Sequence, residues 1–109
     1  MDKGGYVYII GNWTGDVLYT GVTSDLLKRI YQHKEGQGSG FSSKYHATKL
    51  LFYEGYGDIE WAIAREKEIK GWHREKKDAL INSINPNWND LAQGWFEDSS
   101  APPAAARSE

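Results

Sequence analysis

The feature that most constrains the fold is a pair of short aromatic segments separated by turn-forming residues. Side chains alternate along residues 5–10, and those on both sides of this segment are apolar or aromatic, which is typical of a strand covered on two faces. Residues 11–16 are rich in glycine, asparagine and aspartate, so residues 17–21 are expected to return as the second strand of a hairpin. Tyr8 and Tyr19 are expected to point the same way.

An amphipathic helix is expected directly after the hairpin. Thr23 or Ser24 is expected to cap it, and its buried stripe is expected to contain Leu26, Leu27, Ile30 and Tyr31. Arg29 and His33 are four residues apart, so they lie one above the other on a flank beside that stripe. Residues 35–40 are too rich in glycine for regular structure and are expected to form a mobile loop.

The rest of the chain predicts a small α/β fold, with a three-stranded, mainly antiparallel sheet flanked by helices. We expect a third strand over residues 48–54, a helix from residue 57 or 58 to residue 72, a shorter helix over residues 75–83, and a helical turn over residues 91–96. Residues 1–96 are expected to form a single domain and residues 97–109 a disordered tail.

Composition limits the classes of function. The chain has no cysteine, no long apolar segment and no signal-peptide pattern, which predicts a cytoplasmic protein without disulfides or membrane spans. The formal net charge of −2 counts against strong, unspecific binding to nucleic acid. Residues 22–50, however, hold five Lys or Arg against two acidic residues, and this local charge is compatible with a phosphate-contacting face.

A carboxylate falls on the inward face of the expected second long helix. Ala62, Glu66 and Ile69 share one face of this helix, and Trp61 and Ile69 indicate that the face packs inward. Burying a carboxylate without a partner is costly. Two interpretations remain open from spacing alone: Glu66 pairs with Lys70 one turn later, or it binds a divalent metal at the edge of the core.

Taken in order, these residues resemble the GIY-YIG nuclease family. The resemblance covers residues 5–92, and residues 65–72 are similar to the small stand-alone bacterial branch of predicted endonucleases. The matching features are Tyr6-Val7-Tyr8 and Tyr19-Thr20-Gly21 at the two strand motifs, Arg29 and His33 on the first helix, Glu66 four residues after Ala62, and Asn89 in a Pro-x-x-Asn sequence. The chain departs from the family pattern at Tyr6, Thr20 and Val22, which stand where relatives have glycine, a branched aliphatic residue and, in some, lysine.

The resemblance implies a metal-dependent endonuclease that hydrolyses phosphodiester bonds in DNA. It implies that Arg29 binds phosphate and that Glu66 holds one Mg²⁺ or Mn²⁺ ion, largely ligated by water. Tyr8 then orients or deprotonates the attacking water, and His33 takes the proton of Tyr8 or orients it.

Tyr19 and Asn89 complete the site that the resemblance implies, by fixing water and phosphate through hydrogen bonds. Gly21 is expected to be structural, ending its strand and letting the chain turn into the helix.

The substrate and the activity itself have alternatives. Candidate nucleic-acid contacts are Trp13, Phe41, Lys44 and Tyr45; their aromatic rings either stack on unpaired bases, which favours single-stranded or branched DNA, or serve as local packing anchors. The rival functions are a nucleic-acid-binding module with weak or no cleavage, and a protein-interaction module on the same scaffold. The sequence leaves the oligomeric state open.

Overall fold

The computed structural model describes residues 4–38 and 40–96 of the chain, and these form a three-stranded sheet between two layers of helix. The strands are β1 (Gly5–Gly11), β2 (Leu18–Thr23) and β3 (Lys49–Tyr56). They lie in the order β2-β1-β3, and both pairs are antiparallel. The expected sheet is therefore confirmed, whereas the tail expected over residues 97–109 lies outside the described residues.

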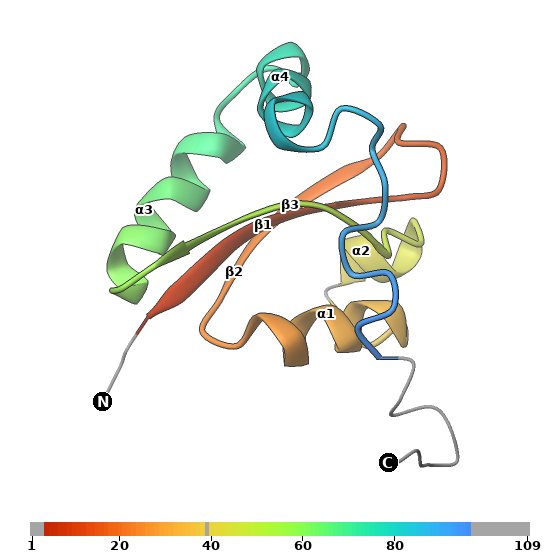
Figure 1. Cartoon of the computed structure of the whole chain (residues 1–109), viewed down its shortest axis with the longest axis horizontal. Coiled ribbons are helices and arrows are strands. Elements are labelled where there is room, and N and C mark those ends of the chain that lie inside the picture. The colour runs from red at the N-terminus through yellow and green to blue at the C-terminus, as the bar shows by residue number, and fades with distance from the viewer. Residues whose placement is uncertain (1–3, 39, 97–109) are drawn as a thin grey trace.

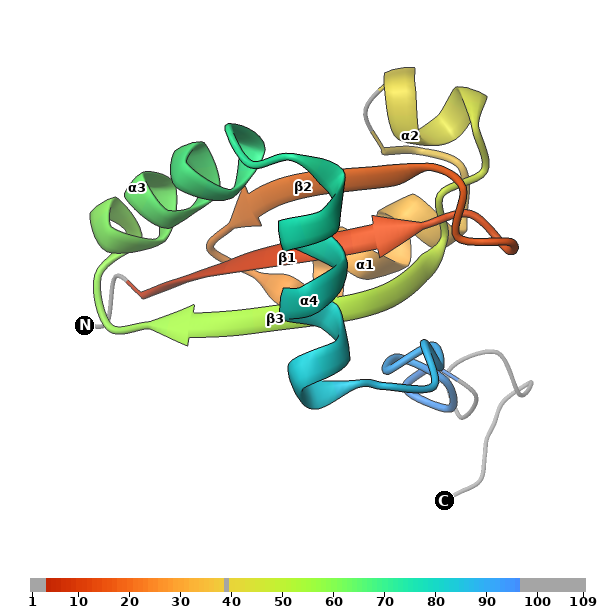
Figure 2. The same ribbon diagram turned by 90° about the horizontal axis from the view of Figure 1, so that it is seen from above.

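Helices cover both faces of the sheet (Figure 1). They are α1 (Leu26–Lys34), α2 (Gly40–Lys44), α3 (Ile59–Lys70) and α4 (Arg74–Ile84). Figures 1 and 2 show α1 on one face and α3 and α4 on the other. The short helix α2 begins inside the segment expected to be a loop and was not anticipated. None of the helices within the described residues is both long and apolar enough to cross a membrane.

The central strand β1 supplies side chains to two separate cores, one on each face of the sheet. Tyr8 and Ile10 belong to the core beneath α1, and Val7 and Ile9 belong to the core beneath α3 and α4. All four side chains are buried. The expectation of a strand covered on both faces is thus correct, and each buried aliphatic side chain contributes roughly 2 kcal/mol to folding.

Helix α1 buries a different face from the one that the sequence predicted. Its buried residues are Leu26, Ile30 and His33, which share a face at i, i+4 and i+7. The predicted stripe was wrong at two positions, because Leu27 and Tyr31 are 57% and 45% exposed. This face places a histidine, rather than aliphatic carbon, against the sheet.

The cap of α1 also differs from the prediction of Thr23 or Ser24. Asp25 is the N-cap, and its carboxylate accepts a hydrogen bond from the backbone N–H of Lys28 at 3.1 Å. Thr23 lies before the helix and does not cap it. Its hydroxyl oxygen accepts a hydrogen bond from the backbone N–H of the N-cap residue, Asp25, at 3.0 Å. Charge favours Asp25, because a carboxylate is stabilised by the positive end of the helix dipole.

On α3 the inward face is narrower than expected. Ala62, Glu66 and Ile69 are buried as predicted, but Trp61 is 67% exposed and does not pack into the core. Glu66 therefore lies on the inward face of a helix whose neighbouring indole points to solvent.

Gly21 is required by close packing rather than by a turn. The expectation that it ends its strand was wrong, since β2 continues to Thr23 and Gly21 is the register partner of Tyr8. A Cβ atom at Gly21 would overlap the ring and hydroxyl of Tyr8. The missing side chain makes the space in which the Tyr8 hydroxyl lies.

We predict that Gly21→Ala lowers the free energy of unfolding by about 1–3 kcal/mol, the usual cost of overpacking a core. Urea unfolding measures this change. Gly57→Ala is the matched control, because a Cβ there meets nothing within 4 Å and the substitution is expected to be neutral or slightly stabilising. Equal stability of the two variants would refute the packing role of Gly21.

Candidate active site

A chain of three hydrogen-bonded side chains lies between β1, α1 and α2. The Tyr8 hydroxyl is 2.8 Å from His33 Nε2, and His33 Nδ1 is 2.9 Å from the Ser42 hydroxyl oxygen. Tyr8 and His33 are 1% and 2% exposed. Buried polar groups of this kind rigidify a site when all of them are paired, so the two candidate catalytic side chains are held in fixed orientations.

Sequence reasoning missed the residues that hold His33. Ser42 lies on α2, and Gly38 lies in the preceding segment, where a Cβ atom would overlap both the His33 ring and the Ser42 hydroxyl. The signal was the glycine-rich composition, which we interpreted as a loop. In the structure, the glycine allows the backbone to approach the imidazole closely.

Arg29 lies next to the Tyr8 hydroxyl. Burial raises the pKa of Tyr8 to about 12, while the hydrogen bond and the charge of Arg29 act in the opposite direction. The guanidinium also donates from Nη1 to Gln32 Oε1 at 3.1 Å. Arg29 is only half-buried, so a fixed positive charge stands at the solvent side of the buried tyrosine.

The direction of the hydrogen bonds between Tyr8, His33 and Ser42 follows from the charges and donor groups of the side chains involved. The positive charge of Arg29 acts on the Tyr8 hydroxyl and repels the hydroxyl proton, which favours a hydrogen bond donated by the Tyr8 O–H to His33 Nε2. A neutral imidazole then carries its proton on Nδ1 and donates it to Ser42. Burial and the charge of Arg29 lower the pKa of His33 to about 4, so His33 is neutral at physiological pH and its Nε2 accepts the hydrogen bond from the Tyr8 hydroxyl.

Tyr19 connects this buried centre to the surface through stacked rings. Its ring centroid lies 6.5 Å from that of Tyr8 and 6.1 Å from that of Phe41, with an interplanar angle of 26° to Phe41. Phe41 in turn lies 4.9 Å from Tyr45, whose ring has the Lys44 ammonium 5.5 Å from its centroid. We call Tyr8, Tyr19, Phe41 and Tyr45 the aromatic track. Its outer two rings are exposed.

Glu66 lies on α3, on the other face of the sheet from α1 (Figures 1 and 2). It is 8% exposed, and its charge is among the influences that raise the pKa of Tyr8. Its carboxylate pairs with the ammonium of Lys70, with Oε2 and Nζ 2.5 Å apart. The ion pair that the spacing allowed is therefore present.

The chemistry of the donor set limits the metal that these residues can hold. Among the residues that the structure describes, no three His, Cys, Asp or Glu side chains gather as a metal site. One carboxylate fits a single hard cation that keeps most of its water, as Mg²⁺ does. Glu66 is the residue that would hold it, in place of Lys70.

Asn89 and Trp13 lie elsewhere. The Asn89 backbone N–H donates to Asn85 Oδ1 at 3.1 Å, and its backbone oxygen accepts from Asn85 Nδ2 at 2.8 Å. The next residues bind the outer edge of β3, since Asp90 Oδ1 accepts from the backbone N–H of Leu50 at 3.0 Å. Because β1 separates β3 from β2, the structure does not bring Asn89 to Tyr19. It shares a surface hollow with Trp13.

Comparison with known proteins identifies the family of the chain. A family model described as the GIY-YIG catalytic domain matches residues 4–79, more than half of the chain. The chain belongs to the GIY-YIG family. This is a superfamily of nucleases, generally endonucleases that use divalent metal.

Individual GIY-YIG relatives match most of the chain. It is 39% identical to UPF0213 protein SSP2268 of Staphylococcus saprophyticus over 82 residues, covering 75% of this chain and 98% of the relative. It is 36% identical to UPF0213 protein HQ_3675A of Haloquadratum walsbyi over 75 residues, covering 69% and 83%. The solution NMR structure of UPF0213 protein BH0048 from Bacillus halodurans is similar, with a TM-score of 0.50, 28% identity and coverage of 84% and 97%. These designations state no reaction.

The fold gives the two GIY-YIG strand motifs a physical reason to occur together. The motif positions Tyr6-Val7-Tyr8 and Tyr19-Thr20-Gly21 lie on the antiparallel neighbours β1 and β2. Their register pairs the last residue of one motif, Tyr8, with the last residue of the other, Gly21. The tyrosine hydroxyl thus occupies the space that the glycine leaves.

The lowered pKa of His33 predicts a stability slope in acid. Its pKa is about 4 in the folded protein against 6.5 for a free histidine, so the unfolded chain binds more protons between these two values. The free energy of unfolding is therefore lost as the pH falls through this window, by up to about 3 kcal/mol from His33 alone. Urea unfolding of the wild type and His33→Gln at several pH values measures it. The two curves should converge as the pH falls; parallel curves would contradict the assignment.

Proposed function

We propose that the protein is a metal-dependent endonuclease that hydrolyses phosphodiester bonds in DNA. The proposed catalytic side chains are Tyr8, Tyr19, Arg29, His33 and Glu66. The observation that carries the proposal is the Tyr8 hydroxyl, which lies between the Arg29 guanidinium and the His33 imidazole. Membership of a nuclease superfamily supports it.

Arg29 is proposed to bind the non-bridging oxygens of the scissile phosphate. Its planar fork of donors matches a phosphate, and it stays charged at every physiological pH. Gln32 holds one arm of the guanidinium, which leaves other donors for the phosphate. Charge of this kind next to the reacting phosphorus is usually the largest contribution to catalysis.

Tyr8 is proposed to act as a neutral hydroxyl rather than as a preformed phenolate. With a pKa of about 12, ionising it at neutral pH would cost about 7 kcal/mol. We propose that, as the water oxygen bonds to phosphorus, Tyr8 takes one proton of that water and passes its own proton to His33 Nε2. Ser42 keeps the imidazole in the orientation that receives it. The P–O bond to the leaving oxygen breaks in the same step, and that oxygen keeps the electron pair and takes a proton from solvent, to which His33 later returns its own.

Tyr19 is proposed to hold the attacking water or the phosphate through its hydroxyl, since its ring packs against both Tyr8 and His33. Glu66 is proposed to hold one Mg²⁺ or Mn²⁺ ion. When bound, such an ion supplies positive charge at the leaving oxygen.

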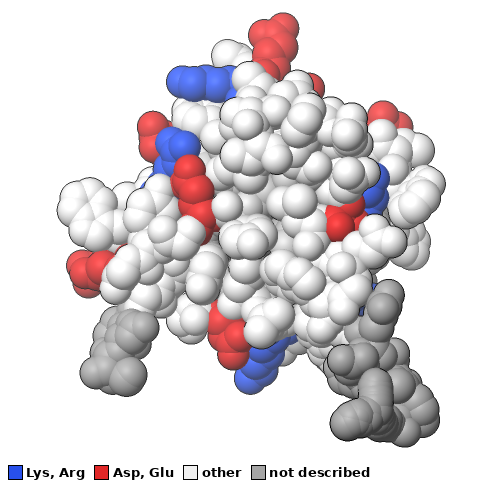
Figure 3. All heavy atoms as spheres, in the orientation of Figure 1, with Lys and Arg blue, Asp and Glu red and all other residues white. Residues whose placement is uncertain are grey.

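The substrate is proposed to contain unpaired bases near the cut. On the face shown in Figure 3, acidic and basic side chains lie mainly around the periphery and form no broad basic patch. The exposed end of the aromatic track, Phe41 and Tyr45, offers ring faces to bases, and Lys44 offers an adjacent charge to a phosphate. Stacking of this kind binds single strands without sequence preference.

A second candidate function is nucleic-acid binding without efficient cleavage. It is favoured by the pairing of Glu66 with Lys70, because a carboxylate already neutralised by an ammonium binds a metal ion less well. The near-neutral net charge of −2 also indicates that a DNA complex of this chain alone is weak.

One experiment separates the two functions. Labelled single-stranded, duplex and branched DNA is incubated with the protein and Mg²⁺, Mn²⁺ or a chelator. We expect metal-dependent cutting, a loss of about 10³-fold or more in Arg29→Ala, and a loss of about 10²-fold in Glu66→Gln.

Variants of two exposed residues close in sequence to Arg29 and Glu66 serve as controls for the cleavage experiment. Lys28→Ala removes an exposed charge beside Arg29, and Glu68→Gln removes an exposed carboxylate on the same helix as Glu66; both should cut at nearly the rate of the wild type. Binding without cutting would support the second function. Cutting that survives both Arg29→Ala and Glu66→Gln would show that the site is misplaced.

We predict that Lys70→Met strengthens metal binding, because it removes the ammonium that occupies the Glu66 carboxylate. A half-exposed ion pair contributes about 1 kcal/mol, so the midpoint for Mn²⁺ binding should fall about fivefold. Electron paramagnetic resonance of free Mn²⁺ measures this without DNA. Lys67→Met, an exposed lysine on the same helix, should bind as the wild type does. An unchanged midpoint in Lys70→Met would mean that Glu66 is not the ligand.

A further inference from the structure

A surface hollow beside the β1–β2 turn is distinct from the proposed site of cleavage. It is lined by Trp13 from the turn, Lys49 at the start of β3, and Asn87, Trp88, Asn89, Asp90 and Gln93 from the segment after α4. Figures 1 and 2 show this turn, α2 and the segment after α4 at the same end of the sheet. The hollow and the exposed end of the aromatic track therefore belong to one end of the molecule.

Trp13 is the most exposed of the large hydrophobic side chains described, at 81%. Its ring is nonetheless held, because the Lys49 ammonium lies 5.0 Å from the ring centroid. Leaving an indole in water brings no stability to the fold. An indole face beside an ammonium is the combination that binds a nucleobase by stacking and its phosphate by charge.

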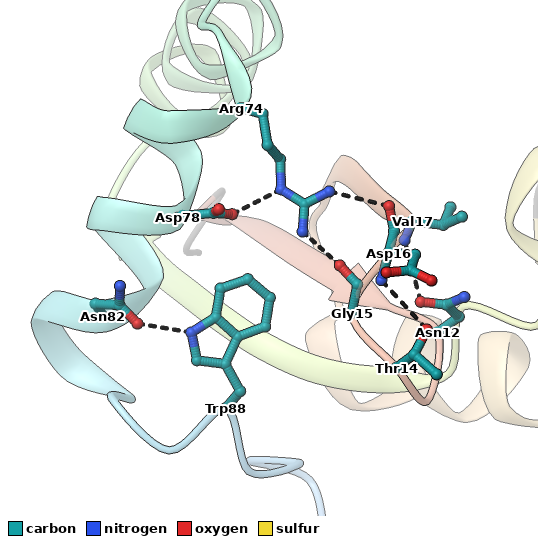
Figure 4. Close-up of polar contacts among 9 residues, drawn as sticks. All are labelled: Asn12, Thr14, Gly15, Asp16, Val17, Arg74, Asp78, Asn82 and Trp88. Carbon is teal, nitrogen blue, oxygen red and sulfur yellow. Dashed lines mark hydrogen bonds and ion pairs between the residues drawn. The ribbon is translucent and has the colours of Figure 1, made fainter.

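The β1–β2 turn that carries Trp13 is tied to α4 and to Trp88. The guanidinium of Arg74 on α4 donates hydrogen bonds to two backbone oxygens of the β1–β2 turn, those of Gly15 and Asp16, and the bond to Asp16 is 3.0 Å long (Figure 4). Arg74 also donates to the carboxylate of Asp78 at 2.7 Å. Trp88 packs beneath the turn, since a Cβ atom at Gly15 would lie 3.2 Å from the indole. These hydrogen bonds and this packing contact hold the turn that carries Trp13 in place.

Trp88 itself is fixed at a second point. Its Nε1 donates to Asn82 of α4 at 2.6 Å (Figure 4). Its backbone has a φ of 55°, an uncommon value for a bulky residue that persists only where the surroundings impose it. The two tryptophans thus stand on a preorganised frame, which lowers the entropy cost of binding a ligand there.

Three amide side chains at the rim are available to a ligand. Within the described residues, the side chains of Asn87, Asn89 and Gln93 make no hydrogen bond to the protein. Asp90, by contrast, is fully engaged, because it accepts from Lys34 and from two backbone N–H groups. The hollow therefore presents amide donors and acceptors, while the carboxylate that would repel a phosphate is already paired.

We propose that this hollow binds one unpaired nucleotide of the DNA strand whose backbone is cut at the Tyr8 centre. Trp13 stacks on the base, Lys49 binds its phosphate, and the amides of Asn87, Asn89 and Gln93 contact the edge of the base. This inference rests on the proposed function, and it moves Asn89 from catalysis to substrate binding.

The spacing suits a neighbouring nucleotide rather than the scissile one. Trp13 follows Tyr8 by five residues along β1 and its turn, which is at most about 17 Å at the rise of a strand. A paired base is hidden inside the duplex stack, so an indole at this position reaches a base only where the strand is single or splayed. A duplex offers Trp13 no ring face.

Binding is tested with a chelator present, so that no cleavage is needed. Fluorescence anisotropy with a labelled oligothymidylate is expected to show binding by the wild type and about tenfold weaker binding by Trp13→Ala. Trp61→Ala is the matched control, because Trp61 is also highly exposed, at 67%, but lies on α3; it should bind as the wild type does. Urea unfolding checks that Trp13→Ala remains folded.

Two further measurements distinguish a nucleotide site from a general surface effect. Lys49→Met should lower the dependence of log affinity on log salt concentration by about 0.7, the value for one phosphate contact on a single strand. In NMR spectra, the indole N–H signal of Trp13 should move when a thymidine dinucleotide is added, while that of Trp61 should not.

The outcomes separate this inference from the proposed function. If the wild type does not bind DNA, both the proposed function and the nucleotide site in the hollow are refuted. If the wild type binds DNA and Trp13→Ala binds equally well, the hollow is not the nucleotide site, and the proposed function still stands. The same conclusion follows if Trp61→Ala weakens binding as much as Trp13→Ala does. Equal loss of duplex and single-strand affinity in Trp13→Ala would overturn its assignment to an unpaired nucleotide. Loss confined to single strands would support it.

Discussion

The arrangement of the whole site depends on one tight contact, that of the Tyr8 hydroxyl with the backbone of Gly21. Tyr8 is on the central strand, so its ring enters the core beneath α1 and its hydroxyl ends against β2. The hydroxyl must then find partners inside the protein, since a buried hydroxyl without a hydrogen bond is costly. His33 supplies one partner from α1, and Arg29 supplies the other. The orientation of α1 that exposes Leu27 and Tyr31 follows from this need, because it turns His33 inward.

Burial also sets the chemistry available to the site. Desolvation moves the pKa of Tyr8 up and that of His33 down, so both are neutral at physiological pH although they share a proton. A pair of this kind is a poor standing base, because Tyr8 holds its proton much more tightly than His33 does at rest. In the proposed mechanism, the proton moves to His33 only as the attacking water loses its own proton to Tyr8. Charge at the site comes instead from Arg29 and from the Glu66–Lys70 pair. In the proposed mechanism, stabilisation of the phosphate is thereby separated from movement of the proton.

Local patterns predicted the sheet, the order of the elements and the inward position of Glu66, because alternation and helical spacing act within a few residues. They failed where distant contacts decide. Trp61 appeared to be a core residue, but no neighbour covers it at its place on α3. The glycine-rich segment suggested a loop, whereas Gly38 is small because it lies against His33, and Ser42 follows on a short helix. Asn89 matched a motif by order alone, and only the path of the chain along the outer edge of β3 shows that it lies apart from Tyr19.

A chain with a net charge of −2 has little long-range attraction for a polyanion, so the proposed binding of DNA requires contacts at short range. Exposed rings meet this requirement, since stacking is insensitive to net charge. The two groups of exposed rings, Phe41 with Tyr45 and Trp13 beside Lys49, are carried by α2 and by the β1–β2 turn, which lie at one end of the sheet. Each pairs an aromatic face with a single lysine. The proposed preference for single strands then has a geometric reason, because a duplex keeps the ring faces of its bases inside the stack and offers such a surface only its phosphate charges.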